Sequence, residues 1–103
     1  MNAQPHTSRP ARQRYRETPE FTGMVTRGAR ALGQRVASGE VENLGQFARA
    51  QEALDLAKWQ AIQGLRDFGY SWAEIGDSLG ITRQAAHKWH RDNAARFTQT
   101  PAA

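Results

Sequence analysis

The sequence predicts an all-α protein: a long helical lead-in packed on a C-terminal helix-turn-helix, with about four helices and no sheet. Three observations support this fold class. Apolar residues recur at three- and four-residue intervals through most of the chain. No segment alternates apolar and polar residues with a period of two. Residues 69–92, "GYSWAEIGDSLGITRQAAHKWHRD", read as two short helices joined with almost no loop. The chain has 103 residues, the size of one domain at most.

Residues 1–17 are predicted to form a flexible basic N-terminal arm. They are rich in Arg, Pro, Gln and Ser and have almost nothing to bury, which is typical of a disordered segment. Pro5 and Pro10 disfavour a helix in this part of the chain. Residues 1–16 contain no acidic residue and four arginines spaced two or three apart: Arg9, Arg12, Arg14 and Arg16.

Residues 18–69 are predicted to form two amphipathic helices that serve as a scaffold. Thr18 can cap the first helix, Pro19 suits its first turn, and Ser38-Gly39 ends it. The second helix is expected to run unbroken over residues 40–69, because its apolar residues keep helical spacing for about seven turns. Gly69 is a natural left-handed stop for that helix.

Two glycines and one tryptophan of the second helix each have two interpretations. Gly45 and Gly64 are either points where another element approaches closely or simply tolerated surface glycines. Trp59, next to Lys58 near the edge of the helix, belongs either to the periphery of the core or to a partner-binding stripe formed with the first helix.

Residues 70–96 are predicted to form the helix-turn-helix unit, followed by a loose tail over residues 97–103. Ser71 and Glu74 have the spacing of a capping box, in which a hydroxyl and a carboxylate satisfy first-turn amides reciprocally. Gly80 is expected to end this short helix in a left-handed conformation, Ile81 to fill the corner, and Thr82 to cap the next helix. So short a junction turns the chain sharply, which is the layout of a helix-turn-helix.

The helix after Thr82 has two different faces. On a helical wheel, Ala85, Ala86 and Trp89 point toward the core. The polar residues on the opposite side are Arg83, Gln84, His87, Lys88 and Arg91. Arginine pairs with guanine, glutamine with adenine, and lysine with phosphate or guanine, so this face is typical of a recognition helix. The alternative is an ordinary solvated polar face.

These residues support a resemblance to a known group. The segment "SWAEIGDSLGITRQAAHKWH" resembles the helix-turn-helix of small DNA-binding proteins of actinobacteria and their phages, and is more distantly similar to the DNA-reading region of sigma factors. The resemblance covers residues 69–91 and does not extend to residues 1–40. It implies that Thr82 caps the recognition helix with a phosphate contact within reach. The base-edge or backbone contacts that it implies fall to Arg83, Gln84, His87 and Lys88. Trp89 departs from the pattern, which has a basic or smaller residue there.

Composition and charge narrow the function classes. The absence of cysteine excludes disulfides, thiolate metal sites and cysteine nucleophiles. No apolar run approaches the roughly 18 residues of a membrane span, and no secretory signal is present, so a soluble intracellular protein is expected. The net charge is +4, with basic ends and an acidic middle. That distribution suits either a surface that faces a polyanion or a basic protein with no special partner.

Other chemistry is not expected. His87 and His90 have a spacing that can hold a metal, but a structural zinc site generally needs four ligands and no third is evident. Glu74 and Asp77 are better explained by capping and solvation than by catalysis. No catalytic residue, metal, cofactor or small-molecule substrate is therefore predicted.

The sequence predicts a cytoplasmic, DNA-associated protein that binds double-stranded DNA sequence-specifically, as a transcriptional regulator or phage control protein. A homodimer through residues 20–65 is expected, because one short recognition helix offers few base contacts. The arginine arm is expected to enter the minor groove or to follow the phosphates, or else to be an unstructured solubilising tail. The alternative function is an oligomeric assembly adaptor, such as a small phage DNA-packaging subunit that docks through the helix-turn-helix.

Overall fold

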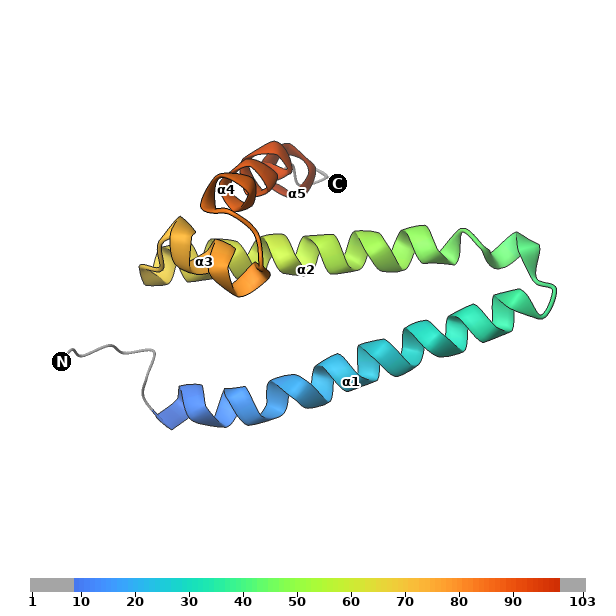
Figure 1. Ribbon diagram of the computed structural model, residues 1–103. Coiled ribbons are helices and arrows are strands. Elements are labelled where there is room, and N and C mark those ends of the chain that lie inside the picture. The colour runs from blue at the N-terminus through green and yellow to red at the C-terminus, as the bar shows by residue number, and fades with distance from the viewer. Residues whose placement is uncertain (1–8, 99–103) are drawn as a thin grey trace. The chain divides into compact units, whose positions relative to one another are not determined.

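The computed structural model describes the backbone of residues 9–98 and the side chains of residues 18–98. Within residues 9–98 every regular element is a helix and no strand occurs, which confirms the predicted fold class. The elements are α1 (Arg9–Ala37), the 3₁₀ helix η2 (Val41–Asn43), α2 (Gln46–Phe68), α3 (Trp72–Leu79), α4 (Arg83–Asp92) and α5 (Ala94–Thr98) (Figure 1). The chain divides into two units, one ending at Gln46 and the other beginning at Phe47.

The first helix begins earlier than the sequence predicts. α1 starts at Arg9 rather than at Thr18, so from Arg9 onward the basic segment is helical backbone instead of a flexible arm. Pro10 lies in the first turn, where its missing N–H has no helical partner to lose, whereas Pro19 lies inside the helix. The residues between the two prolines are mostly good helix formers, which favours continuation of the helix through Pro19. Residues 1–8 of the predicted arm lie outside the described residues.

A sharp turn follows α1. Gly39 has a φ of 122°, a backbone conformation that side chains disfavour. The N–H of Glu40 then donates to the carbonyl oxygen of Val36 at 3.0 Å. The carboxylate of Glu40 lies 3.5 Å from Arg35 Nε and accepts a hydrogen bond from Asn43 Nδ2 at 2.9 Å. Since η2 occupies the next turn, the helix predicted over residues 40–69 is interrupted and α2 begins only at Gln46.

The C-terminal end of α2 agrees with the sequence. Gly69 has a φ of 111°, and its N–H donates to the carbonyl oxygen of Arg66 at 3.0 Å. The N–H of Tyr70 donates to the carbonyl oxygen of Leu65 at 3.0 Å, which completes a Schellman motif. A Cβ added at Gly45 or Gly64 would meet no atom within 4 Å, so these two are tolerated glycines rather than points of close approach.

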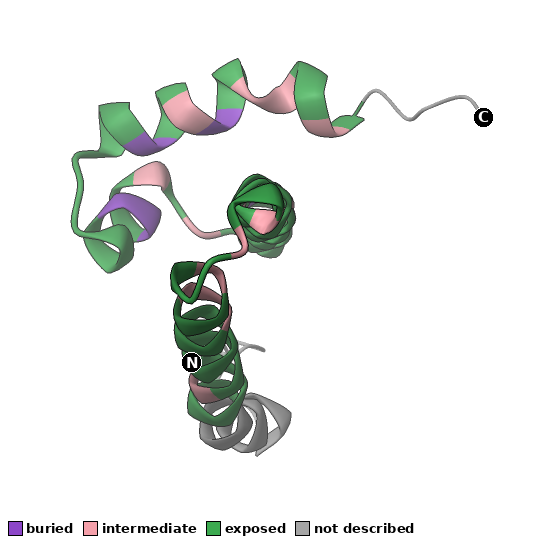
Figure 2. Cartoon of the chain, turned by 90° about the vertical axis from the view of Figure 1, so that its right-hand side faces the viewer, coloured by how far each residue is buried: buried purple, intermediate pink, exposed green. Residues whose placement is uncertain are grey.

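The core of the second unit forms where α2, α3 and α4 meet. Ile62, Ile75 and Ala86 are buried there, one from each helix. Three half-buried aromatic residues pack against them: Tyr70, Trp72 and Trp89. Figure 2 shows the buried segments of α4 on the side of that helix that faces α3. Ala85 is exposed, so the inward face of α4 is narrower at this end than the sequence predicts.

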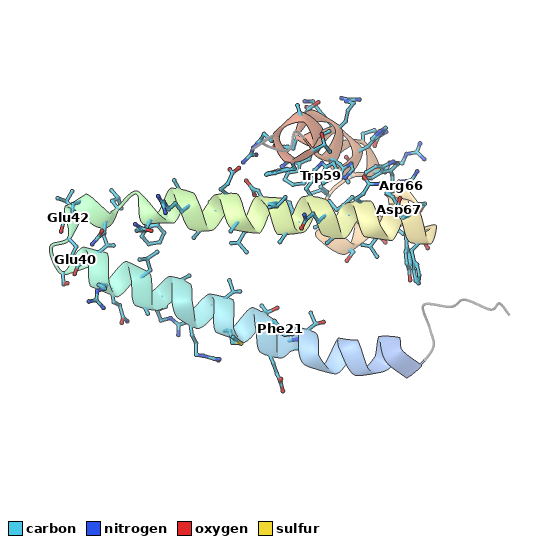
Figure 3. All side chains as sticks on the ribbon, turned by 180° about the vertical axis from the view of Figure 1, so that it is seen from behind. Phe21, Glu40, Glu42, Trp59, Arg66 and Asp67 are labelled. Atoms are coloured by element: carbon cyan, nitrogen blue, oxygen red, sulfur yellow. The ribbon has the colours of Figure 1, made fainter. Side chains whose placement is uncertain are left out.

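Trp59 and His90 extend this core. Trp59 is only 8% exposed, and its Nε1 donates to the carbonyl oxygen of His90 at 2.8 Å. Figure 3 shows Trp59 on the side of α2 that faces α4. Of the two sequence interpretations, the core one is therefore confirmed for this residue. His90 is also buried, although helical periodicity does not predict it as a core residue.

The C-terminal segment continues as a fifth helix. α4 ends at Asp92 with Asn93 as its cap, and α5 follows at once, so that its last two residues fall in the segment 97–103 for which the sequence predicts a loose tail. The ring of Phe97 lies 6.3 Å from that of Trp59, and Arg96 pairs with Glu52 and Asp55 of α2. These contacts hold α5 against α2. Residues 99–103 lie outside the described residues.

Candidate nucleic-acid interface

The junction between α3 and α4 is a tight backbone-to-backbone contact. Gly80 has a φ of 77° and donates its N–H to the carbonyl oxygen of Asp77 at 3.1 Å. The N–H of Ile81 donates to the carbonyl oxygen of Gly76 at 2.9 Å, so α3 ends in a second Schellman motif. A Cβ at Gly76 would lie 2.8 Å from Ile81 O and 2.9 Å from Thr82 O, so no side chain fits there. Ile81 does not fill the corner as predicted, because its side chain is 44% exposed.

Both short helices begin with the predicted caps. Ser71 Oγ accepts from the N–H of Glu74 at 3.0 Å, and Glu74 Oε1 accepts from the N–H of Ser71 at 2.8 Å, which confirms the capping box. Thr82 Oγ1 accepts from the N–H of Ala85 at 3.0 Å and caps α4. A side-chain cap stabilises a helix by about 1 kcal/mol. α3 and α4 have only 8 and 10 residues, so the caps and the shared core together keep them helical.

The six predicted DNA-contacting residues lie on the cap and the outer face of α4, and all six are exposed: Thr82, Arg83, Gln84, His87, Lys88 and Arg91. They differ in their partners. The ring of His87 stacks on that of Trp72, with centroids 4.7 Å apart and planes inclined by 19°. Within the described residues Arg83 forms no ion pair, so its guanidinium is available to a ligand.

Lys88 and Arg91 have an internal partner that the sequence reading overlooked. Lys88 Nζ lies 2.6 Å from Asp92 Oδ2, and Arg91 Nε lies 3.4 Å from Asp92 Oδ1. The hydrogen bond from Lys88 is the main cause that lowers the pKa of Asp92, so this carboxylate is charged at neutral pH. Asp92 therefore pairs with two of the basic residues of the predicted recognition face.

A hollow lies beside the first turn of α4. Its volume is about 420 Å³, and seven residues from α2, α4, and α3 with its N-cap line it: Arg66, Ser71, Trp72, Ala73, Arg83, Gln84 and His87. The hollow thus brings together three of the six predicted residues. It also adds Arg66 of α2, which the sequence reading missed. The available signal was a basic residue in the last turn of a helix that ends directly before the helix-turn-helix.

The remaining predicted contacts belong to another part of the chain. The four arginines Arg9, Arg12, Arg14 and Arg16 belong to the first turns of α1, in the other unit, and their side chains lie outside the described residues. The two histidines that have metal-ligand spacing are not equivalent, since His87 is exposed and His90 is buried. Within residues 18–98 no group of three or more His, Asp or Glu is placed to hold a metal ion. Among residues 9–98 no helix combines the length and the apolar character that a membrane crossing requires.

A comparison with known protein families gives a match in the part of the chain that contains this site. Residues 52–100 match the model of the homeodomain-like domain family, a range that contains most of α2 and all of α3, α4 and α5. This match supports a helix-turn-helix DNA-binding protein. Neither the curated proteins nor the solved structures that were searched gave a match.

Proposed function

We propose that the protein binds double-stranded DNA sequence-specifically, with α4 as the recognition helix in the major groove. The observation that carries this proposal is the first turn of α4. There Arg83 and Gln84 are exposed and Thr82 caps the helix. Arginine and glutamine make bidentate contacts with guanine and adenine in the major groove, and the cap fixes the start of the helix that carries them.

The biological role follows from what accompanies the recognition helix. The helix-turn-helix and its lead-in occupy most of the described chain, which supports DNA binding as the main activity of this part of the protein. We place the protein among transcriptional regulators or phage control proteins, in association with DNA in the cytoplasm.

We also propose a homodimer through residues 20–65. On α1, Phe21, Met24 and Val25 are 49–63% exposed and follow one another at helical spacing. On α2, Leu54 and Leu65 are also exposed. A second copy would cover such apolar side chains and double the number of base contacts, with half-sites about one helical turn apart.

One experiment tests the function. Duplexes bound by the full-length protein are selected from a random pool, and the mass of the free and bound protein is measured by sedimentation. A recovered motif with two half-sites and a dimeric mass supports both proposals. Weak binding without sequence preference would contradict the proposed function and favour the assembly adaptor. A strictly monomeric protein, free and on DNA, would contradict the dimer alone.

A further inference from the structure

We propose that the hollow beside α4 is a seat for one phosphate of the DNA backbone, with Arg66 of α2 as its principal ligand. This inference rests on the proposed DNA binding and adds a contact from outside the helix-turn-helix. The hollow of about 420 Å³ is large enough for a phosphate group, and its seven lining residues include three basic side chains and no carboxylate. The basic residues come from two helices: Arg66 from α2, and Arg83 and His87 from α4.

Arg66 is held at this hollow by two contacts. Its Nη1 donates to the carbonyl oxygen of Tyr70 at 2.8 Å. Its guanidinium carbon lies 5.0 Å from the ring centroid of Trp72, a cation–π distance. Neither contact neutralises the charge, and within the described residues Arg66 forms no ion pair with a carboxylate. Because the side chain is already oriented, it loses little conformational entropy when it binds an anion. Because no carboxylate neutralises its charge, that charge is available to the anion.

Trp72 also contacts the imidazole of His87. The ring of His87 stacks on the same indole that Arg66 covers. Trp72 itself is half-buried against the core, so its position is set by the packing of the unit. One indole therefore organises groups from α2 and α4 around a single hollow.

Backbone amides add to the positive character of the hollow. The first-turn amides of a helix have no partner within the helix. The capping box satisfies those of Ser71 and Glu74, and leaves the amides of Trp72 and Ala73, two residues that line the hollow. Amides in this position favour anions. The same hollow contains Gln84 of the recognition turn, so its anion would lie beside the bases that α4 reads. A duplex places a backbone phosphate at that position, and phosphate contacts set the register of the protein on DNA.

The test compares Arg66→Gln with a matched control, Lys58→Gln. Lys58 also lies on α2 and also covers an indole, that of Trp89, with its Nζ 4.1 Å from the ring centroid, but it does not line the hollow. Both variants remove one charge and one cation–π contact from the same helix. Circular dichroism at the assay temperature checks that both remain folded. Binding to the selected duplex is then measured over a range of salt concentrations.

Arg66→Gln is expected to weaken binding about three- to tenfold at moderate salt and to lower the salt slope by about one unit, without changing the preferred bases. Lys58→Gln is expected to change neither. A second arm replaces single phosphates of the duplex by neutral methylphosphonates. One position should weaken binding of the wild-type protein and have no further effect on Arg66→Gln.

The outcomes separate the two proposals. If the wild-type protein selects no duplex, the proposed function itself fails. If it binds but Arg66→Gln behaves like the wild type or like Lys58→Gln, the phosphate seat is wrong while DNA binding stands. An altered base preference in Arg66→Gln would also overturn the seat, since it would make Arg66 a base reader. Methylphosphonate effects that are the same in wild type and variant would do so too.

Discussion

The indole of Trp59 and the imidazole of His90 lie face to face, with ring centroids 4.3 Å apart and planes only 7° from parallel. Trp59 comes from α2 and His90 from α4, so this stack and the indole hydrogen bond join the lead-in helix to the helix proposed to read DNA. His90 Nε2 is buried without a hydrogen-bond partner among the described residues. The core thus contains an imidazole that a proton would charge in an apolar setting.

The second unit should lose stability in mild acid because of His90. Burial lowers the pKa of His90 below its usual value of about 6.5, and the charges of His87 and Arg66 act in the same direction. Below pH about 6.5 the unfolded chain therefore binds a proton that the folded chain resists. The free energy of unfolding should have its highest value above that pH and should decline as the pH falls toward the lowered pKa of His90.

Urea unfolding followed by tryptophan fluorescence at several pH values measures this decline. His90→Phe keeps a stacking ring and removes the titrating group, so it should flatten the profile between pH about 7.5 and 5.5. His87→Gln serves as the control, since His87 is exposed, and it should keep most of the decline. An unchanged profile in His90→Phe would mean that another group titrates.

Gly76→Ala should destabilise the second unit, because a Cβ there would meet the backbone oxygens of Ile81 and Thr82 below 3.0 Å. Overpacking of this kind lowers the free energy of unfolding by about 1–3 kcal/mol. Gly64→Ala is the matched control within a helix, where a Cβ meets nothing within 4 Å, and it should raise stability by up to about 1 kcal/mol. Thermal unfolding of both variants gives the comparison. Equal effects would contradict the close contact at Gly76.

Gln84→Ala and Arg83→Ala should each weaken binding to the selected duplex by about 1–3 kcal/mol and relax the preference at one base pair. The reason is that both side chains are exposed in the capped first turn of α4. Repeating the duplex selection with each variant measures the preference. If Gln84→Ala recovers the wild-type motif, Gln84 is not a base reader.

Asp92→Asn should strengthen DNA binding, because it releases Lys88 and Arg91 and removes a negative charge from the same helix. The gain should be roughly three- to tenfold at low salt and shrink at high salt, as expected for a phosphate-directed effect. The selected sequence motif should stay the same. Asp77→Asn is a control on α3, an exposed carboxylate without an ion pair among the described residues. A gain of the same size in Asp77→Asn would show that only net charge matters.

Replacing Arg9, Arg12, Arg14 and Arg16 together by glutamine tests the basic N-terminal segment. Glutamine preserves helix propensity in this part of α1 and removes four charges. If these arginines contact phosphates, the salt slope should fall by up to about four units while the preferred bases remain. Unfolding of the second unit should not change. A variant whose affinity and salt slope match the wild type would assign the segment no role in DNA binding.

The sequence was most informative where local rules decide the structure. The capping box of Ser71 and Glu74, the left-handed Gly69 and Gly80, and the cap at Thr82 depend on neighbours in the chain, and all are confirmed. The predicted start of α1 is wrong, because the good helix formers between Pro10 and Pro19 continue the helix despite the two prolines.

Residues whose roles depend on distant partners were harder to predict. Periodicity placed Ala85 and Ala86 together, although only Ala86 faces the core. Periodicity also cannot predict the contact between His90 and Trp59, because the two residues are 31 positions apart in the sequence. Arg66 was missed for the same reason, since its position at the hollow depends on contacts with Trp72 and on residues of α4.

The absence of a side chain at Gly76 has a consequence for engineering. At Gly76 main-chain atoms of α3 and of the turn before α4 are in direct contact, and the inward side chains of Ile75 and Ala86 complete the packing. The outward residues of α4 can therefore be exchanged without disturbing the packing of α4 against α3. Libraries randomised at positions 83, 84 and 87, with Gly76, Gly80 and Thr82 retained, should yield folded proteins with new target preferences. The unit is in this sense a small, cysteine-free scaffold for retargeting.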